Sequence, residues 1–119
     1  MKIIKTTGFP PGSYKAITIG PWIFTKSDLL TESDIQHESI HWEQQKETLI
    51  LGFFVLYVVF FVVELIRCAA DSSRGIVEGR KRSLWKRAYR SNPFEREAYA
   101  HESEPGYLES RPAWAWIKA

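Results

Sequence analysis

The sequence predicts an α+β fold in which a short hairpin precedes a series of helices. Residues 14–25 form two β-prone runs around Gly20-Pro21, a pattern typical of two strands and a turn. Residues 31–34, Thr-Glu-Ser-Asp, combine the hydroxyl and acidic side chains of a helix start. At 119 residues, 45% of them hydrophobic, the chain is long enough for one core, and we expect residues 1–119 to form a single domain.

The composition excludes several classes of protein. Sixteen Lys and Arg residues against fourteen Asp and Glu give a formal net charge of +2, so we expect no nucleic-acid partner. The single cysteine, Cys68, excludes an internal disulfide and a thiolate zinc cluster. Residues 1–12 lack the apolar run of a secretory signal peptide, which favours a cytoplasmic location.

The first half of the chain divides into three segments. Residues 1–30 are expected to hold the hairpin and a connector, and residues 31–48 a largely polar helix. Gly52 is expected to end or kink that helix. Residues 49–67 are almost entirely apolar, with no charge before Glu64. Their β-branched and aromatic content suits a buried strand, but their length and helical flanks favour a helix.

The second half is more polar. Residues 71–82 contain two glycines and a run of three basic residues, which predicts an exposed basic loop. Residues 83–103 are expected to form the glutamate-bearing helical segment. A first stretch covers residues 84–89, and Asn92-Pro93 is a typical start for the helix that continues from Phe94 to about Glu102. Residues 104–119 follow a Pro-Gly break and form a tail rich in aromatic side chains.

One motif in the polar helix indicates chemistry. Residues 37–41 read His-Glu-Ser-Ile-His, an H-E-x-x-H sequence. Side chains four residues apart lie on one face of a helix, so His37 and His41 can bind the same Zn²⁺ ion. Glu38 lies about 100° around the helix axis, where it can hold a water without becoming a ligand. This arrangement is typical of a metalloprotease.

A catalytic zinc requires a third protein ligand, and the residues alone leave several candidates. They are His101, Cys68 and the downstream carboxylates Glu95, Glu97, Glu102 and Glu104.

Residues 92–100, Asn-Pro-Phe-Glu-Arg-Glu-Ala-Tyr-Ala, resemble the E-x-x-A-D segment by which gluzincin peptidases donate a glutamate to zinc. Together with the H-E-x-x-H helix, the resemblance extends to the CAAX prenyl endoprotease group and to some short bacterial proteins of unassigned role. It implies a minimal zincin-like fold with Glu95 as the zinc ligand and Ala98 as the small residue at a helix contact. Glu97 is the alternative ligand. Tyr99 replaces the aspartate that orients a zinc histidine in the family, so Tyr99 or Glu97 is left to make that contact.

The resemblance also implies a mechanism of peptide hydrolysis. Glu38 would act as the general base towards a zinc-activated water. Tyr99, Tyr107 and His101 are the candidates for stabilising the oxyanion. In zincins an edge strand beside the active-site helix pairs with extended substrate, and here the candidate strand consists of Trp22, Ile23, Phe24 and Thr25.

The apolar segment limits these interpretations. If residues 49–66 crossed a membrane, about 30 Å of hydrocarbon would separate the two histidines from Glu95, unless the chain re-enters. We therefore expect a helix that packs under the site or lies partly in a membrane surface. The expected function is a zinc-dependent hydrolase, a peptidase acting on peptide or protein substrates. The alternatives are a zinc-stabilised, membrane-associated binding or structural protein without turnover, and a single-pass membrane protein with an accidental motif.

Overall fold

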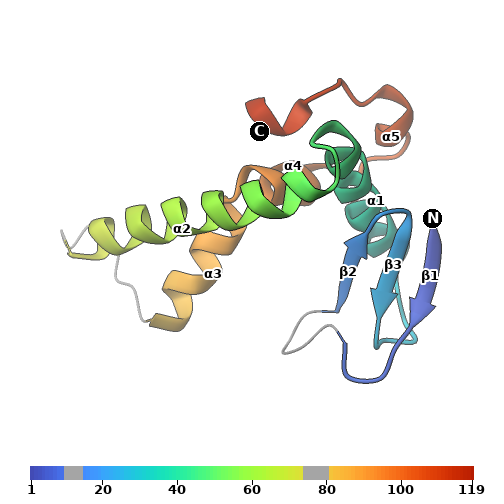
Figure 1. Cartoon of the computed structure of the whole chain (residues 1–119), viewed down its shortest axis with the longest axis horizontal. Coiled ribbons are helices and arrows are strands. Elements are labelled where there is room, and N and C mark those ends of the chain that lie inside the picture. Colours follow the sequence, from blue (N-terminus) through green and yellow to red (C-terminus); the bar gives the residue numbers. More distant parts are fainter. Residues whose placement is uncertain (10–14, 74–80) are drawn as a thin grey trace.

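The computed structural model describes residues 1–9, 15–73 and 81–119 and confirms the α+β class. A small sheet lies at one end of the molecule, and two helices, α2 and α3, project away from it (Figure 1). In chain order the elements are β1 (Lys2–Lys5), β2 (Ala16–Ile19), β3 (Trp22–Thr25), α1 (Glu32–Glu47), α2 (Leu51–Ser73), α3 (Lys81–Ser91), α4 (Pro93–His101), α5 (Tyr107–Ser110) and the 3-10 helix η1 (Ala115–Lys118).

The sheet contains the expected hairpin and one further strand. β2 and β3 pair antiparallel around Gly20, whose φ of 61° suits glycine. β1 pairs parallel with the other side of β3, so the strand order is β1-β3-β2. The expected hairpin therefore accounts for two of the three strands in residues 1–30, and β1 was not predicted. The sequence gives no local signal for β1 because its partner lies about twenty positions away, with no tight turn between them.

Helix α1 begins where the sequence predicts. The Thr31 hydroxyl accepts a hydrogen bond from the Asp34 amide, and the Asp34 carboxylate accepts one from the Thr31 amide. The expected break at Gly52 is wrong, because α1 ends at Glu47 and Gly52 lies in the first turn of α2. The chain reverses at Leu49 and Ile50, which adopt left-handed φ angles of 60° and 61°.

Helices α2 and α3 form a helical hairpin. α2 continues to Ser73, beyond the expected end at residue 67, because residues 67–73 contain no glycine or proline. α3 packs against α2, and the Phe61 and Trp85 rings stack with centroids 5.4 Å apart. The expected basic loop over 71–82 is therefore wrong at both ends, which are helical, and its central residues 74–80 lie outside the described chain.

The expected glutamate-bearing segment, residues 83–103, forms two helices that meet at Asn92, where the sequence predicts a helix start. The Asn92 side chain accepts a hydrogen bond from the Phe94 amide, and proline occupies the first position of α4. Because proline lacks an N–H and restricts the residue before it, a new helix starts here. Asn92 also donates to the carbonyl of Tyr57, which fixes the start of α4 against α2.

Two apolar clusters hold α4 in place. Ile40 of α1, Ala98 of α4 and Tyr107 of α5 form one, and the small Ala98 side chain allows the two longer helices to lie close together. The other joins Phe53, Phe94 and Trp116 from α2, α4 and η1. The tail expected over 104–119 thus contains two short helices that pack on α1 and α4. This packing places one face of α4 directly against the H-E-x-x-H helix.

Candidate metal centre

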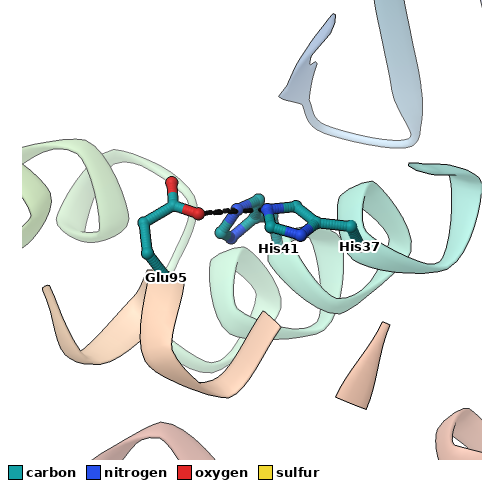
Figure 2. Close-up of side chains that lie close together, drawn as sticks. All are labelled: His37, His41 and Glu95. Carbon is teal, nitrogen blue, oxygen red and sulfur yellow. Dashed lines mark hydrogen bonds and ion pairs between the residues drawn. The ribbon is translucent and has the colours of Figure 1, made fainter. Parts of the chain in front are cut away.

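Two histidines and a glutamate meet at the contact between α1 and α4 (Figure 2). The Nε2 atoms of His37 and His41 lie 3.0 Å and 3.1 Å from Oε1 of Glu95. One potential ligand atom from each residue lies within 4.8 Å of the other two, and all three side chains are buried. The histidines come from successive turns of α1, and Glu95 comes from the first turn of α4.

This donor set fits a metal ion. Two imidazole nitrogens and a carboxylate oxygen are ligands that Zn²⁺ accepts, with bonds of about 2.0–2.1 Å and donor atoms about 3.3 Å apart in a tetrahedron. The two nitrogen–oxygen distances to Glu95 are only slightly shorter than this. The group could therefore hold a metal after a small outward movement of its side chains. The donor types suit several divalent metals, of which zinc is one.

The second nitrogen of each histidine faces an oxygen atom. Nδ1 of His41 lies 2.8 Å from Oε1 of Gln44, and Nδ1 of His37 lies 3.7 Å from a carboxylate oxygen of Glu102. An oxygen at Nδ1 favours the tautomer with its proton there, which leaves the Nε2 lone pair for a metal. The resemblance implied such a contact from Tyr99 or Glu97, whereas Gln44 is the residue within hydrogen-bond distance of Nδ1 of His41.

Glu95 is oriented in the same way by a residue of the apolar helix. The Tyr57 hydroxyl of α2 donates to Oε2 of Glu95 at 2.7 Å, while Oε1 faces the histidines. Sequence reasoning missed this role, because Tyr57 lies within a continuous apolar run. A single hydroxyl in that run was the only available signal.

The buried cluster is strongly coupled electrostatically. Burial alone would lower the pKa of His41, but the carboxylate of Glu95 raises it to about 9. Burial would likewise raise the pKa of Glu95, but His41 and His37 hold it well below its usual range. Both shifts favour a charged imidazolium of His41 beside a charged carboxylate of Glu95.

Glu38 occupies a separate position beside the cluster. The Thr18 hydroxyl of β2 donates to its Oε1 at 2.7 Å. Burial raises the pKa of the Glu38 carboxyl, although the charge on His41 and the Thr18 hydrogen bond oppose the rise. Within the described chain the possible metal-binding group consists of His37, His41 and Glu95 and does not include Glu38.

A cavity of about 290 Å³ opens beside the ligand group, and Glu38, His41 and Glu95 line it. The apolar residues of its wall come from β2 and α2: Ala16, Ile17, Phe53, Phe54 and Tyr57. A second cavity, of about 540 Å³, shares Glu38 with the first and reaches His37, Phe61 and Trp85. The two cavities follow the space between the sheet and the α2–α3 hairpin.

Several expected site residues lie elsewhere. Glu97, the alternative ligand, receives hydrogen bonds from Gln44, Tyr107 and Arg111 instead. The His101 ring stacks on Tyr107 and its Nδ1 faces Glu104. Among the residues that line the two cavities in the described chain, Glu97, His101 and Tyr107 do not appear. Their positions speak against an oxyanion role for His101 and Tyr107.

Tyr99 does lie beside the ligands. Its ring packs edge-on against His37, with centroids 4.5 Å apart, and it lines the second cavity. Burial raises the pKa of its phenol. The contact that Tyr99 makes with His37 is therefore aromatic rather than acidic.

The expectation that residues 22–25 (Trp22, Ile23, Phe24 and Thr25) offer a free strand edge is wrong. These residues form β3, the central strand, whose two edges are paired with β1 and β2. The strand beside α1 is β2, and its residues Ala16, Ile17 and Thr18 line the cavity at the ligand group. In the described part of the chain, β2 pairs on one side only. Of the two outer strands, β1 and β2, it is β2 that lines this cavity.

Comparison of the chain with protein-family models, with curated proteins and with solved structures found no match.

Proposed function

We propose that this protein is a zinc-dependent peptidase of gluzincin type, with His37, His41 and Glu95 as the metal ligands and Glu38 as the general base. The observation that carries the proposal is the meeting of Glu95 with both histidines of an H-E-x-x-H helix, beside a cavity that Glu38 also lines. A structural metal site requires neither the carboxylate base nor the cavity.

A zinc ion in this site would supply Lewis acidity, which activates water and polarises a carbonyl group. Glu38 accepts a proton from the water that attacks the peptide carbonyl, and later passes it to the departing amine. The water oxygen forms the new bond to carbon while the carbon–nitrogen bond breaks. The raised pKa of Glu38 suits a group that must both take and return a proton.

The walls of the cavity indicate how a substrate would lie. An extended peptide could add to the outer edge of β2 at Ala16 through main-chain hydrogen bonds. Farther along β2, the Thr18 carbonyl and the Gly20 amide are already hydrogen-bonded to the Gln45 side chain. Such a peptide would pass Glu38 and the ligand group, because Thr18 of β2 contacts Glu38 directly. The apolar wall formed by Phe53 and Phe54 then favours an apolar side chain next to the cleaved bond.

The variant Glu38→Gln tests this proposal. We expect the wild-type protein to bind one zinc ion and to hydrolyse unstructured peptides, and Glu38→Gln to keep the zinc and lose at least about 99% of the activity. Zinc is measured by elemental analysis, and hydrolysis by mass spectrometry of a peptide mixture.

Two results would contradict the proposal. Zinc binding without hydrolysis in the wild-type protein would favour the non-catalytic, zinc-stabilised protein. Equal hydrolysis by the wild type and Glu38→Gln would place the activity outside this site. The variant Glu43→Gln, which changes a partly exposed glutamate of the same helix, controls for general effects of removing a charge from α1.

A further inference from the structure

Helix α2 carries a continuous apolar stripe that the rest of the described chain leaves exposed. Its seven aliphatic side chains are between 45% and 74% exposed: Leu51, Val55, Val58, Val59, Val62, Val63 and Ile66. At 100° per residue they occupy one arc of about 140° and extend for about 22 Å along the helix. The opposite face packs into the molecule through Phe53, Tyr57 and Phe60. A stripe of this length is more than the scattered apolar residues of an ordinary surface.

The stripe has basic and aromatic neighbours. α3, which packs along α2, contains five Lys and Arg residues and no Asp or Glu. Of these, Lys86 and Arg90 are exposed. Trp85, itself 53% exposed, stacks on Phe61 of α2. Arg67 follows the last residue of the stripe and is largely exposed. Apolar residues flanked by tryptophan and cations are typical of a helix that lies in an anionic membrane surface.

We propose that the α2 stripe docks this protein flat on an anionic lipid bilayer, with Lys86 and Arg90 of α3 at the lipid phosphates. The segment Leu51–Ala70 is long and apolar enough to span a membrane, and 11% of it is buried. However, a spanning α2 would draw α3, with Lys86 and Arg90, into the hydrocarbon, which is costly for charged side chains. An orientation in the membrane plane leaves those charges at the headgroups.

A second copy of the chain fits the stripe less well. A stable protein interface takes about 20–30 residues from each partner, and the stripe supplies seven. Two copies joined stripe to stripe would also bring two positively charged α3 helices near each other. A bilayer has neither problem, because it covers an apolar face of any shape and attracts the same charges.

Docking in this orientation would place the candidate active site at the membrane. Phe61 and Trp85 of the α2–α3 hairpin line the cavity that also reaches His37 and Glu38. One wall of this cavity would therefore belong to the lipid-bound α2–α3 hairpin. Segments of membrane-associated proteins would then be the nearest substrates. The docking surface itself does not depend on the proposed chemistry.

Vesicle flotation of the full-length protein tests the docking surface. We expect the wild type to float with vesicles of phosphatidylcholine and phosphatidylglycerol, and less with phosphatidylcholine alone or in high salt. The double variant Val58→Glu with Val62→Glu should lower the partition coefficient at least about tenfold. Leu29→Glu, which changes an 80% exposed leucine outside α2, is the matched control and should float like the wild type. Lys86→Gln should reduce flotation on the anionic vesicles only.

Each opposite outcome has a distinct meaning. Wild-type protein that stays in solution, or a double variant that floats like the wild type, overturns the proposal. So does a soluble dimer that the double variant converts to monomer, because a second copy then covers the stripe. Resistance of the vesicle-bound wild type to alkaline extraction would show a spanning α2. Circular dichroism confirms that the variants fold. Two further measurements separate failure of docking from failure of the proposed function. Glu38→Gln should float like the wild type, and the double variant should still hydrolyse peptides in the absence of lipid.

Discussion

At the residue scale, the candidate metal-binding group of His37, His41 and Glu95 is held in place by neighbouring side chains. The Gln44 side chain makes three hydrogen bonds. Its amide oxygen faces His41, and its amide nitrogen donates to the Phe94 carbonyl and to Glu97. Glu97 is in turn fixed by Arg111. Glu97, the alternative ligand in the sequence analysis, thus holds Gln44 in place, and Gln44 contacts His41.

The first prediction at this scale separates the two glutamates. Glu95→Gln should weaken zinc binding by more than about a hundredfold, because it removes a charged ligand, whereas Glu97→Gln should weaken it by about tenfold or less. Competition with a chromogenic chelator measures both affinities. If Glu97→Gln loses more zinc affinity than Glu95→Gln, the ligand assignment is wrong.

A second prediction concerns the hydroxyl that orients Glu95. Tyr57→Phe deletes that hydroxyl without changing the packed ring, so we expect a loss of about tenfold in zinc affinity. Tyr107→Phe is the matched control, because its hydroxyl donates to Glu97 instead. The control should keep nearly all of the zinc affinity. Equal affinities for Tyr57→Phe and the wild type would mean that the Tyr57 hydrogen bond does not position the ligand.

At the scale of the elements, local signals predicted well and long-range ones did not. The helix caps at Thr31 and Asn92 and the turn at Gly20 involve residues that are close in sequence. Short sequence patterns therefore predict α1, α4 and the hairpin. Strand β1 depends on a partner far along the chain, and its four residues give no signal of their own. The order of strands in the sheet has the same origin. For this reason the sequence suggested the wrong strand as the exposed edge.

The end of the chain supplies a prediction at this scale. Arg111, in the connection between α5 and η1, forms buried ion pairs with Glu97 of α4 and Glu47 of α1. Arg111→Ala would leave Glu97 buried without its cation, so the free energy of unfolding should fall by about 3–5 kcal/mol. Arg67→Ala, at an exposed ion pair, should change it by less than about 1 kcal/mol. Urea denaturation measures both variants, and equal effects would contradict the structural role of Arg111.

At the scale of the whole molecule, the hairpin of α2 and α3 reconciles two sequence features that appear incompatible. A long apolar segment separates the histidines from Glu95 in the chain, and a membrane crossing would keep them apart. In the structure α3 packs back along α2, so that α4, which follows α3, lies beside α1 (Figure 1). The histidines and Glu95 therefore meet. The apolar segment thus carries Tyr57 to the site on one face and leaves an aliphatic stripe on the other.

The stability of the whole chain should depend jointly on zinc and pH. In the protein stripped of metal by a chelator, the raised pKa of His41 gives a stabilisation that is complete below its ordinary value of 6.5 and is lost as the pH rises through about 9. The lowered pKa of Glu95 gives a stabilisation that is present above 4.5 and is lost as the pH falls towards its folded value. The metal-free protein should therefore be most stable between pH 4.5 and pH 6.5, the ordinary pKa values of Glu95 and His41.

The proposed zinc ion would have to displace the proton from His41. Its stabilising effect should therefore grow with rising pH. We expect the rise in Tm on adding zinc to be small near about pH 5.5 and to increase steadily towards about pH 8.5, as the competing proton becomes easier to remove. Thermal unfolding with zinc or with chelator, followed by circular dichroism, measures the difference. Glu95→Gln should abolish it at every pH. A zinc effect that is constant over this range would mean that the metal binds without displacing the proton shared by His41 and Glu95.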